Sequence, residues 1–280
     1  MHEMMYIHMI YLYTVIQVYR GCSVSIVISF GIQKGGVGKT TVTGITSWLL
    51  SRLGKNVLAV DFDSQGNLTQ FLTQRNIYDF SKKTVLEACK SKNAANFIHN
   101  ISDGFDILPA EDLLATFSRF LYREYKGNPN TLLRDTLVTV KDQYDYILID
   151  LPPNLGDQTI NGLTASDFAV AMLQSEPFCL DALDRYIETL HHVQKNTNQN
   201  LVLLGILTSL SDRRTIIDAK IIEQARLDYE DIVFDTMIHR RSRIKEFSLT
   251  GIRDRTKNDQ EALRDYMSFV EELVARVEKR

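Results

Sequence analysis

The chain has 280 residues, with 32 Lys and Arg against 35 Asp and Glu, a formal net charge of −3 and an isoelectric point near 6.1. Hydrophobic residues make up 44% and charged residues 24%, the proportions of an ordinary globular protein with a sizeable core. The overall negative field repels phosphate, so any binding of nucleic acid must use a local basic patch. Cys22, Cys89 and Cys179 are far apart and form no C-x-x-C pair, which argues against a zinc or iron–sulfur site and fits a reducing cytoplasm.

Residues 1–23 form an apolar, aromatic extension. Its apolar run, 4–19, contains His8 and Gln17 and is shorter than the roughly 20 apolar residues of a bilayer span. No basic segment or clear cleavage site marks a signal peptide. Three interpretations stay open: a start site placed upstream of a native start at Val24, a loose or partner-binding arm, and a membrane anchor.

Residues 24–280 alternate apolar strand-like runs with helical patterns, which predicts a single α/β domain built on a parallel sheet. Strands are predicted at 25–30, 56–61, 105–108, 146–150, 168–173, 201–207 and 232–234. Helices are predicted at 42–53, 84–90, 111–125, 131–141, 180–195, 216–226 and 259–277. Several strands are apolar on both faces, so we expect a doubly wound, mostly parallel, twisted sheet with helices on both faces. A ligand should lie at the carboxyl ends of the strands.

One run carries the strongest functional signal. Residues 34–41 read Lys-Gly-Gly-Val-Gly-Lys-Thr-Thr and lie between an apolar strand and a helix. Glycines let backbone N–H groups turn inward as an anion nest, and the helix start adds the positive end of its dipole. In such a loop Lys39 reaches the β- and γ-phosphates and the Thr40 hydroxyl ligates Mg²⁺. The predicted nucleotide-binding residues are Gly35, Gly36, Val37, Gly38, Lys39, Thr40 and Thr41.

The loop departs from the general P-loop pattern in a specific way. Gln33 stands where that pattern has glycine, and an additional lysine, Lys34, opens the loop. This form resembles the ParA/MinD family of P-loop ATPases, in which the second lysine contacts nucleotide on the opposite subunit of an ATP-sandwich dimer. The resemblance implies a P-loop NTPase fold, ATP and Mg²⁺ as cofactors, a homodimer formed on ATP binding, and a catalytic role for Lys34 with Lys39.

Two carboxylate motifs follow predicted strands. Phosphoryl transfer requires Mg²⁺ and an oriented water, and carboxylates at strand ends beside the phosphate loop are placed for both. Residues 60–67, Val-Asp-Phe-Asp-Ser-Gln-Gly-Asn, resemble the second family motif, with Ser64 in place of proline. That resemblance assigns Asp63 to water activation and to the metal. Residues 144–153 are a buried strand that ends in Asp150 and Pro-Pro, a Walker B pattern in which Asp150 holds Mg²⁺. The predicted metal residues are therefore Thr40, Asp63 and Asp150.

Basic residues gather at 213–214 and 239–245. Spacing alone favours a phosphate-binding face and solvated helix ends equally. The resemblance to ParA-type partition ATPases points to the first, because Arg214 and Arg243 match positions that contribute to sequence-independent DNA binding there. Arg240 and Arg241 are expected to assist. His239 stands where the family usually has proline, so base contacts in that loop are left open.

The resemblance therefore implies a plasmid or chromosome partition ATPase that is cytoplasmic and nucleoid-associated. Its ATP dimer binds double-stranded DNA nonspecifically, and a centromere-binding, ParB-like partner stimulates an otherwise weak ATP hydrolysis. The alternative is a MinD-like membrane- or cargo-positioning ATPase. Because the C-terminal residues 269–280 carry acidic pairs that suit anionic lipid poorly, no membrane association is expected. A small-molecule kinase or non-motor regulator is a third possibility, and the unusual loop argues against most kinases.

Overall fold

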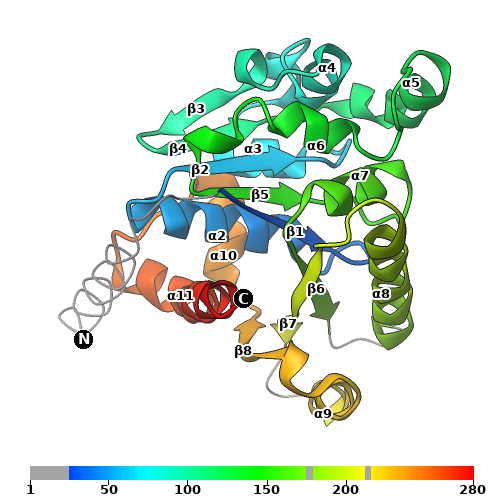
Figure 1. Cartoon of the computed structure of the whole chain (residues 1–280). Helices are drawn as coiled ribbons and strands as arrows, with labels where there is room; N and C mark the ends of the chain where they lie inside the picture. The colour runs from blue at the N-terminus through cyan, green and yellow to red at the C-terminus, as the bar shows by residue number, and fades with distance from the viewer. Residues whose placement is uncertain (1–24, 175–178, 212–215) are drawn as a thin grey trace.

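The computed structural model describes residues 25–174, 179–211 and 216–280 (Figure 1). The predicted extension 1–23 and Arg214 lie outside these ranges. The strands are β1 (Ile26–Gly31), β2 (Val57–Asp61), β3 (His99–Ser102), β4 (Phe105–Leu108), β5 (Tyr146–Asp150), β6 (Phe168–Gln174), β7 (Val202–Ser211) and β8 (Val233–His239). The helices are α2 (Lys39–Arg52), α3 (Asn67–Thr73), α4 (Val85–Ser91), α5 (Phe117–Arg123), α6 (Leu132–Leu137), α7 (Asp157–Ala165), α8 (Cys179–Asn196), α9 (Ile216–Tyr229), α10 (Ser242–Thr250) and α11 (Lys257–Glu278). Short 3₁₀ turns lie at Ile77–Phe80, Ala95–Phe97, Asp112–Thr116, Lys141–Gln143 and Glu230–Ile232.

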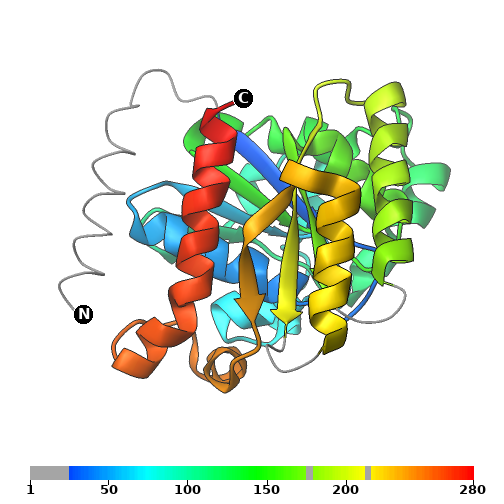
Figure 2. The ribbon, with the colours of Figure 1, turned by 90° about the horizontal axis from the view of Figure 1, so that it is seen from below.

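The strands of the described residues form one twisted sheet in the order β3-β4-β2-β5-β1-β6-β7-β8. Neighbouring strands are parallel, except that β3 runs antiparallel to β4. Helix α2 packs on one face of the sheet and α7 and α8 pack on the other. The last helix, α11, packs against α2 and β8 (Figures 1 and 2). The predicted doubly wound, mostly parallel α/β fold is confirmed.

The central strands form the core. Every residue of β2 and β5 is buried, as are all residues of β1 and β6 except the first of each. Helices on both faces explain why these strands read as continuous apolar runs and not as alternating ones. Strand β5 lies between β1 and β2. The carboxyl ends of these three strands therefore bring together the loop after β1, Asp61 at the end of β2 and Asp150 at the end of β5.

Helix α11 lies beside β8, the last strand of the sheet (Figure 2). The Glu272 carboxylate accepts the backbone N–H groups of Asp235 and Thr236, each at 2.9 Å, and Asp265 accepts that of His239 at 3.1 Å. These bonds occupy amide groups that an exposed edge strand would offer to another chain. The apolar face of α11 is buried against the sheet through Leu263, Tyr266, Phe269, Val270 and Leu273.

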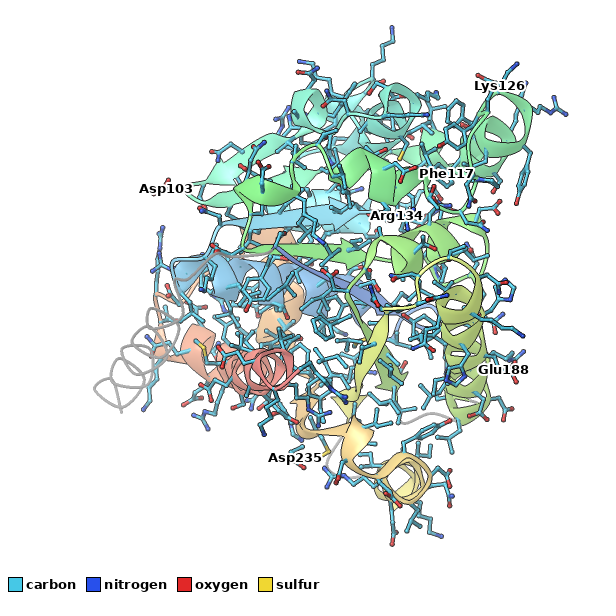
Figure 3. All side chains as sticks on the ribbon, viewed as in Figure 1. Asp103, Phe117, Lys126, Arg134, Glu188 and Asp235 are labelled. Carbon is cyan, nitrogen blue, oxygen red and sulfur yellow. The ribbon has the colours of Figure 1, made fainter. Side chains whose placement is uncertain are left out.

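Two predicted helices are shorter than expected. The range 111–125 is not one helix, because a 3₁₀ turn, Asp112–Thr116, precedes α5. The tighter turn buries Leu114 and Phe117 three residues apart (Phe117 is labelled in Figure 3), whereas Leu113 is 50% exposed. The predicted helix 131–141 ends at Leu137, immediately before three β-branched residues, Val-Thr-Val.

Candidate functional site

The loop between β1 and α2 has the shape of an anion cradle. Gly36 and Gly38 adopt left-handed backbone angles (φ 78° and 81°), and Gly38 is the N-cap of α2. A Cβ atom added at Gly35 or Gly36 would meet nothing within 4 Å, so a ligand can approach this backbone closely. The left-handed angles and the open space agree with the phosphate-binding role predicted for this loop.

Both lysines of the loop make contacts within the chain. Lys39, which is buried, donates from Nζ to the Lys34 carbonyl at 2.9 Å. Burial lowers the pKa of Lys39, although the charges of Asp150 and Asp63 act in the opposite direction. The Lys34 ammonium donates to Cys179 Sγ at the start of α8, at 3.2 Å. The predicted contact of Lys34 with nucleotide on a second subunit stays a prediction.

Thr40 and Asp150 are brought together as the metal prediction requires. The Thr40 hydroxyl donates to Asp150 Oδ2 at 2.7 Å, while the buried Oδ1 of Asp150 has no hydrogen-bond partner among the described residues. Burial, and then the charge of Asp61, raises the pKa of Asp150 to about 8. A hydroxyl and an unsatisfied carboxylate oxygen are the hard ligands that Mg²⁺ prefers.

The described residues contain no cluster of three or more His, Cys, Asp or Glu side chains that could enclose a metal ion. This agrees with Mg²⁺ bound to a nucleotide, because such an ion is held by one or two protein carboxylates together with phosphate oxygens and water. The open glycine backbone and the unpaired oxygen of Asp150 therefore fit a magnesium–nucleotide pair.

The structure separates the roles of the two aspartates in the Asp-x-Asp motif. Asp61, which the sequence motifs did not single out, is buried at the end of β2 and accepts the backbone N–H and hydroxyl of Thr69 at 2.8 and 2.7 Å. It also accepts the N–H of Asp63 at 3.3 Å. Burial raises the pKa of Asp61 to about 7. Asp61 therefore ties the motif to the start of α3.

Asp63 is half-buried and follows the end of β2 by two residues. Its Oδ1 accepts the N–H of Gln65 at 3.0 Å, and its carbonyl accepts the N–H of Gly66 at 3.0 Å. No hydrogen bond between described residues joins its carboxylate to Thr40 or Asp150. Its assignment to the metal and to water activation therefore stays a prediction. The two aspartates of the motif are separated by a single residue. The spacing alone therefore does not indicate which of them is the buried one that binds α3.

Of the predicted DNA-binding arginines, Arg240 and Arg241 lie between β8 and α10, and Arg243 lies in the first turn of α10. Arg240 is exposed. Arg241 lies 3.8 Å from the Asp265 carboxylate. Arg243 is largely buried, because its guanidinium pairs with Asp259 at 2.6 Å and also with Glu246. Arg240 is thus the most accessible of the three for binding phosphate.

His239, the departure from the family pattern, is fixed by α11. Its ring Nδ1 lies 2.9 Å from Asp265 Oδ2, which also accepts its backbone N–H. A proline at this position would lack that N–H. The histidine therefore anchors the start of the arginine segment to α11 through two bonds.

The site and the fold agree with known proteins. Residues 25–203 match the family described as AAA domain. The chain is 36% identical over 256 residues to the chromosome-partitioning ATPase Soj of Thermus thermophilus, covering 90% of this chain and 96% of that protein. It is 35% identical over 236 residues to the sporulation initiation inhibitor protein Soj of Bacillus subtilis, covering 79% and 86%.

The fold is also similar to that of solved structures. A structure titled cobyrinic acid a,c-diamide synthase from Mycobacterium smegmatis, with bound ADP and magnesium, has a TM-score of 0.77 at 28% identity and covers 91% of this chain and 96% of that one. A plasmid partition protein from Borrelia burgdorferi has a TM-score of 0.67 at 25% identity, covering 86% and 98%.

Fold and site together define a P-loop ATPase whose phosphate loop carries an additional lysine, Lys34, at its start. The chain belongs to the ParA/Soj family of partition ATPases, as the sequence motifs predicted.

Proposed function

We propose that this protein is an ATP-driven DNA partition switch, in which ATP binding forms a homodimer that holds double-stranded DNA without sequence preference. A ParB-like, centromere-binding partner would then stimulate hydrolysis and release the dimer. The observation that carries the proposal is the Lys34-containing phosphate loop in a chain that aligns along 90% of its length with a chromosome-partitioning ATPase. We further propose a cytoplasmic, nucleoid-associated protein whose ATPase domain spans residues 24–280.

The residues of the site divide the work of hydrolysis. The backbone N–H groups of the glycine loop and the start of α2 bind the phosphates, with Lys39 as counter-charge. Thr40 and Asp150 hold Mg²⁺, which neutralises charge on the phosphates. Asp63 orients the attacking water and accepts its proton. Lys34 leaves Cys179 to reach the nucleotide of the second subunit, so that hydrolysis depends on dimer formation.

DNA binding is assigned to the segment after β8. Arg240 offers an exposed charge there, while Arg241 and Arg243 are partly neutralised by Asp265 and Asp259. In a dimer the positive electrostatic potentials of two such segments add. Their sum locally offsets the net charge of −3 on each chain. Arg214, on the segment that follows β7, is included from the family resemblance alone.

Structural observations do not favour the MinD-like alternative. The apolar residues of α11, including Tyr266 and Phe269, are buried against the sheet and are not available to a lipid surface. None of the helices in the described part of the chain combines the length and the apolar character needed to cross a bilayer.

A DNA-retention assay with and without a non-hydrolysable ATP analogue, over a series of salt concentrations, tests the proposal. We expect ATP-dependent retention that weakens steeply with salt, together with a shift from monomer to dimer in sedimentation. A protein that stays monomeric when saturated with nucleotide, or that binds DNA equally without it, would contradict the switch.

A further inference from the structure

The end of β7 lies against the phosphate loop at two consecutive points. Ser209 Oγ donates to the Val37 carbonyl at 2.5 Å. The next side chain, Leu210, lies 3.5–3.7 Å from the position that a Cβ on Gly38 would occupy. Neither β7 residue belongs to a motif that the sequence singles out. The phosphate loop thus leans on a strand 172 residues away in the chain.

The hydrogen bond from Ser209 fixes the direction of one peptide group in the loop. Ser209 and Val37 are both buried, so water does not compete for the bond. In a trans peptide the C=O and the following N–H point in opposite directions. Because Ser209 holds the Val37 carbonyl, the N–H of Gly38 points away from β7. The orientation of this N–H matters, since a P-loop binds phosphate with its backbone N–H groups.

Leu210 reaches Gly38 from an unfavourable backbone conformation. Its φ is +54°, in the left-handed region that bulky residues rarely enter. The pairing with β8 is irregular at the same residue: Ser209 pairs with Ile238, but Ser211 pairs with His239, so Leu210 is one residue extra. Bulges of this kind redirect a side chain next to a functional site. Here the bulge turns Leu210 onto Gly38.

We propose that Ser209 and Leu210 are positioning residues for ATP. Ser209 sets the Val37–Gly38 peptide, and the strained Leu210 packs over Gly38, so together they hold the loop ready for the phosphates. The same bulge sets how β7 pairs with the end of β8, and Arg240 follows that end directly. The β7 bulge therefore also couples nucleotide binding to the arginine segment, a second step that rests on the proposed DNA function.

The two variants Ser209→Ala and Leu210→Gly test the positioning role. Ser209→Ala should raise the Kd and KM for ATP about fivefold and leave kcat within about twofold, because a net hydrogen bond of about 1 kcal/mol is removed from the loop. The matched control is Ser166→Ala, which removes an equally buried bond from Ser166 Oγ to the Gly162 carbonyl on α7. That control should change the melting temperature and not the affinity.

Leu210→Gly separates positioning from stability. Glycine tolerates the left-handed angle, so the melting temperature should stay equal or rise, whereas ATP affinity should fall threefold or more. Lys82→Gly is the control, since Lys82 has a φ of +64° on an exposed turn and should leave ATP affinity unchanged. Wild-type ATP affinity in both Ser209→Ala and Leu210→Gly would overturn the proposal. If Ser209→Ala does not fold, Leu210→Gly alone decides.

The coupling is read as the ratio of DNA affinities with and without the ATP analogue, with the analogue at saturation when it is present. In Leu210→Gly this ratio should move toward one. A lowered ATP affinity with an unchanged ratio would leave positioning intact and disprove the coupling. If the wild-type chain itself binds no DNA, the proposed function fails, and the nucleotide measurements still decide the positioning role.

Discussion

Asp61 and Asp150 lie opposite each other in the parallel pairing of β2 and β5, and each is the last residue of its strand. Both are buried, and the pKa of each is raised, that of Asp61 to about 7 and that of Asp150 to about 8, with burial as the main cause. Lys39 is the buried cation that acts on Asp150. Burial disfavours the ionised form of Asp150, and a divalent cation bound beside this carboxylate would stabilise that form.

The raised pKa of Asp150 makes stability depend on pH in a defined direction. Between the ordinary pKa of 3.8 and the folded value of about 8, the folded chain retains a proton that the unfolded chain releases. The free energy of unfolding therefore falls as pH rises through this window. Asp150→Asn removes the ionisation, so without nucleotide we expect its melting temperature to exceed that of the wild type at about pH 8 by at least 2–4 °C, the shift for about 1 kcal/mol in a domain of this size.

Calorimetry from about pH 5 to about pH 8 checks this expectation. The advantage of Asp150→Asn should shrink at the acid end. Asp103→Asn is the control, because Asp103 is exposed on the turn between β3 and β4, at the opposite end of the strands (Figure 3). An Asp150→Asn variant that is no more stable than the wild type at the alkaline end would show that the pKa of Asp150 is not raised.

Asp63→Ala should separate hydrolysis from binding. Among the described residues, the Asp63 carboxylate accepts a hydrogen bond only from a local turn N–H, that of Gln65, so its removal should leave the fold and ATP affinity near wild type. Turnover should fall by about a hundredfold or more, the contribution of a positioned base. Single-turnover kinetics beside equilibrium nucleotide binding measure both. Asp61→Ala is the contrasting variant. It leaves the buried N–H and hydroxyl of Thr69 without their acceptor, so its main effect should be a loss of stability. Wild-type turnover in Asp63→Ala would remove it from the mechanism.

The sequence predicted the parts of the site that rest on short-range patterns. The glycine loop and Asp150 could be located because a strand, a turn and a helix start are encoded by neighbouring residues. The fully apolar runs of β2 and β5 identified central strands for the same reason. The short helix α3 was missed because its residues, Asn67–Thr73, are too few and too polar for a clear period.

Features that depend on distant partners could not be predicted. The burial of Arg243 depends on Asp259, which lies on the next helix. The left-handed angle of Leu210 depends on the register between β7 and β8. In each case the local sequence is compatible with several environments, and tertiary packing selects one.

Lys39→Ala should abolish tight nucleotide binding. The side chain is buried among the loop and Asp150, and burial lowers its pKa, so its full charge is favoured when phosphate is bound. Removal of hydrogen bonds to a charged ligand should weaken ATP binding by about tenfold to a hundredfold. Lys126→Ala, an exposed lysine after α5 (Figure 3), is the control. Fluorescent-nucleotide titration measures the change, and undiminished affinity in Lys39→Ala would contradict the phosphate-loop assignment.

Arg243→Glu should destabilise the fold as well as weaken DNA binding. The Asp259 side chain is fully buried and caps α11 through Thr256, and Arg243 supplies charge beside it. A glutamate there would face two carboxylates, Asp259 and Glu246. We expect a decrease of about 1–3 kcal/mol in the free energy of unfolding, because the buried Asp259 loses its nearest charged partner and keeps, among the described residues, only Arg253, 3.9 Å away. Denaturant titration measures it, and unchanged stability would show that the pair contributes nothing to the fold.

Arg240→Glu gives the cleaner test of the DNA face. Arg240 is exposed at the end of β8 and forms no ion pair with another described residue, so its replacement should leave the melting temperature and the ATP-dependent dimer unchanged. DNA affinity should fall at low salt, and the slope of log affinity against log salt should decrease by about one for each phosphate that a subunit no longer neutralises. Arg134→Glu makes the same charge change at an exposed position of α6 (Figure 3) and should have a much smaller effect. If both variants weaken DNA binding equally, the weakening reflects net charge, and the segment after β8 is not the binding face.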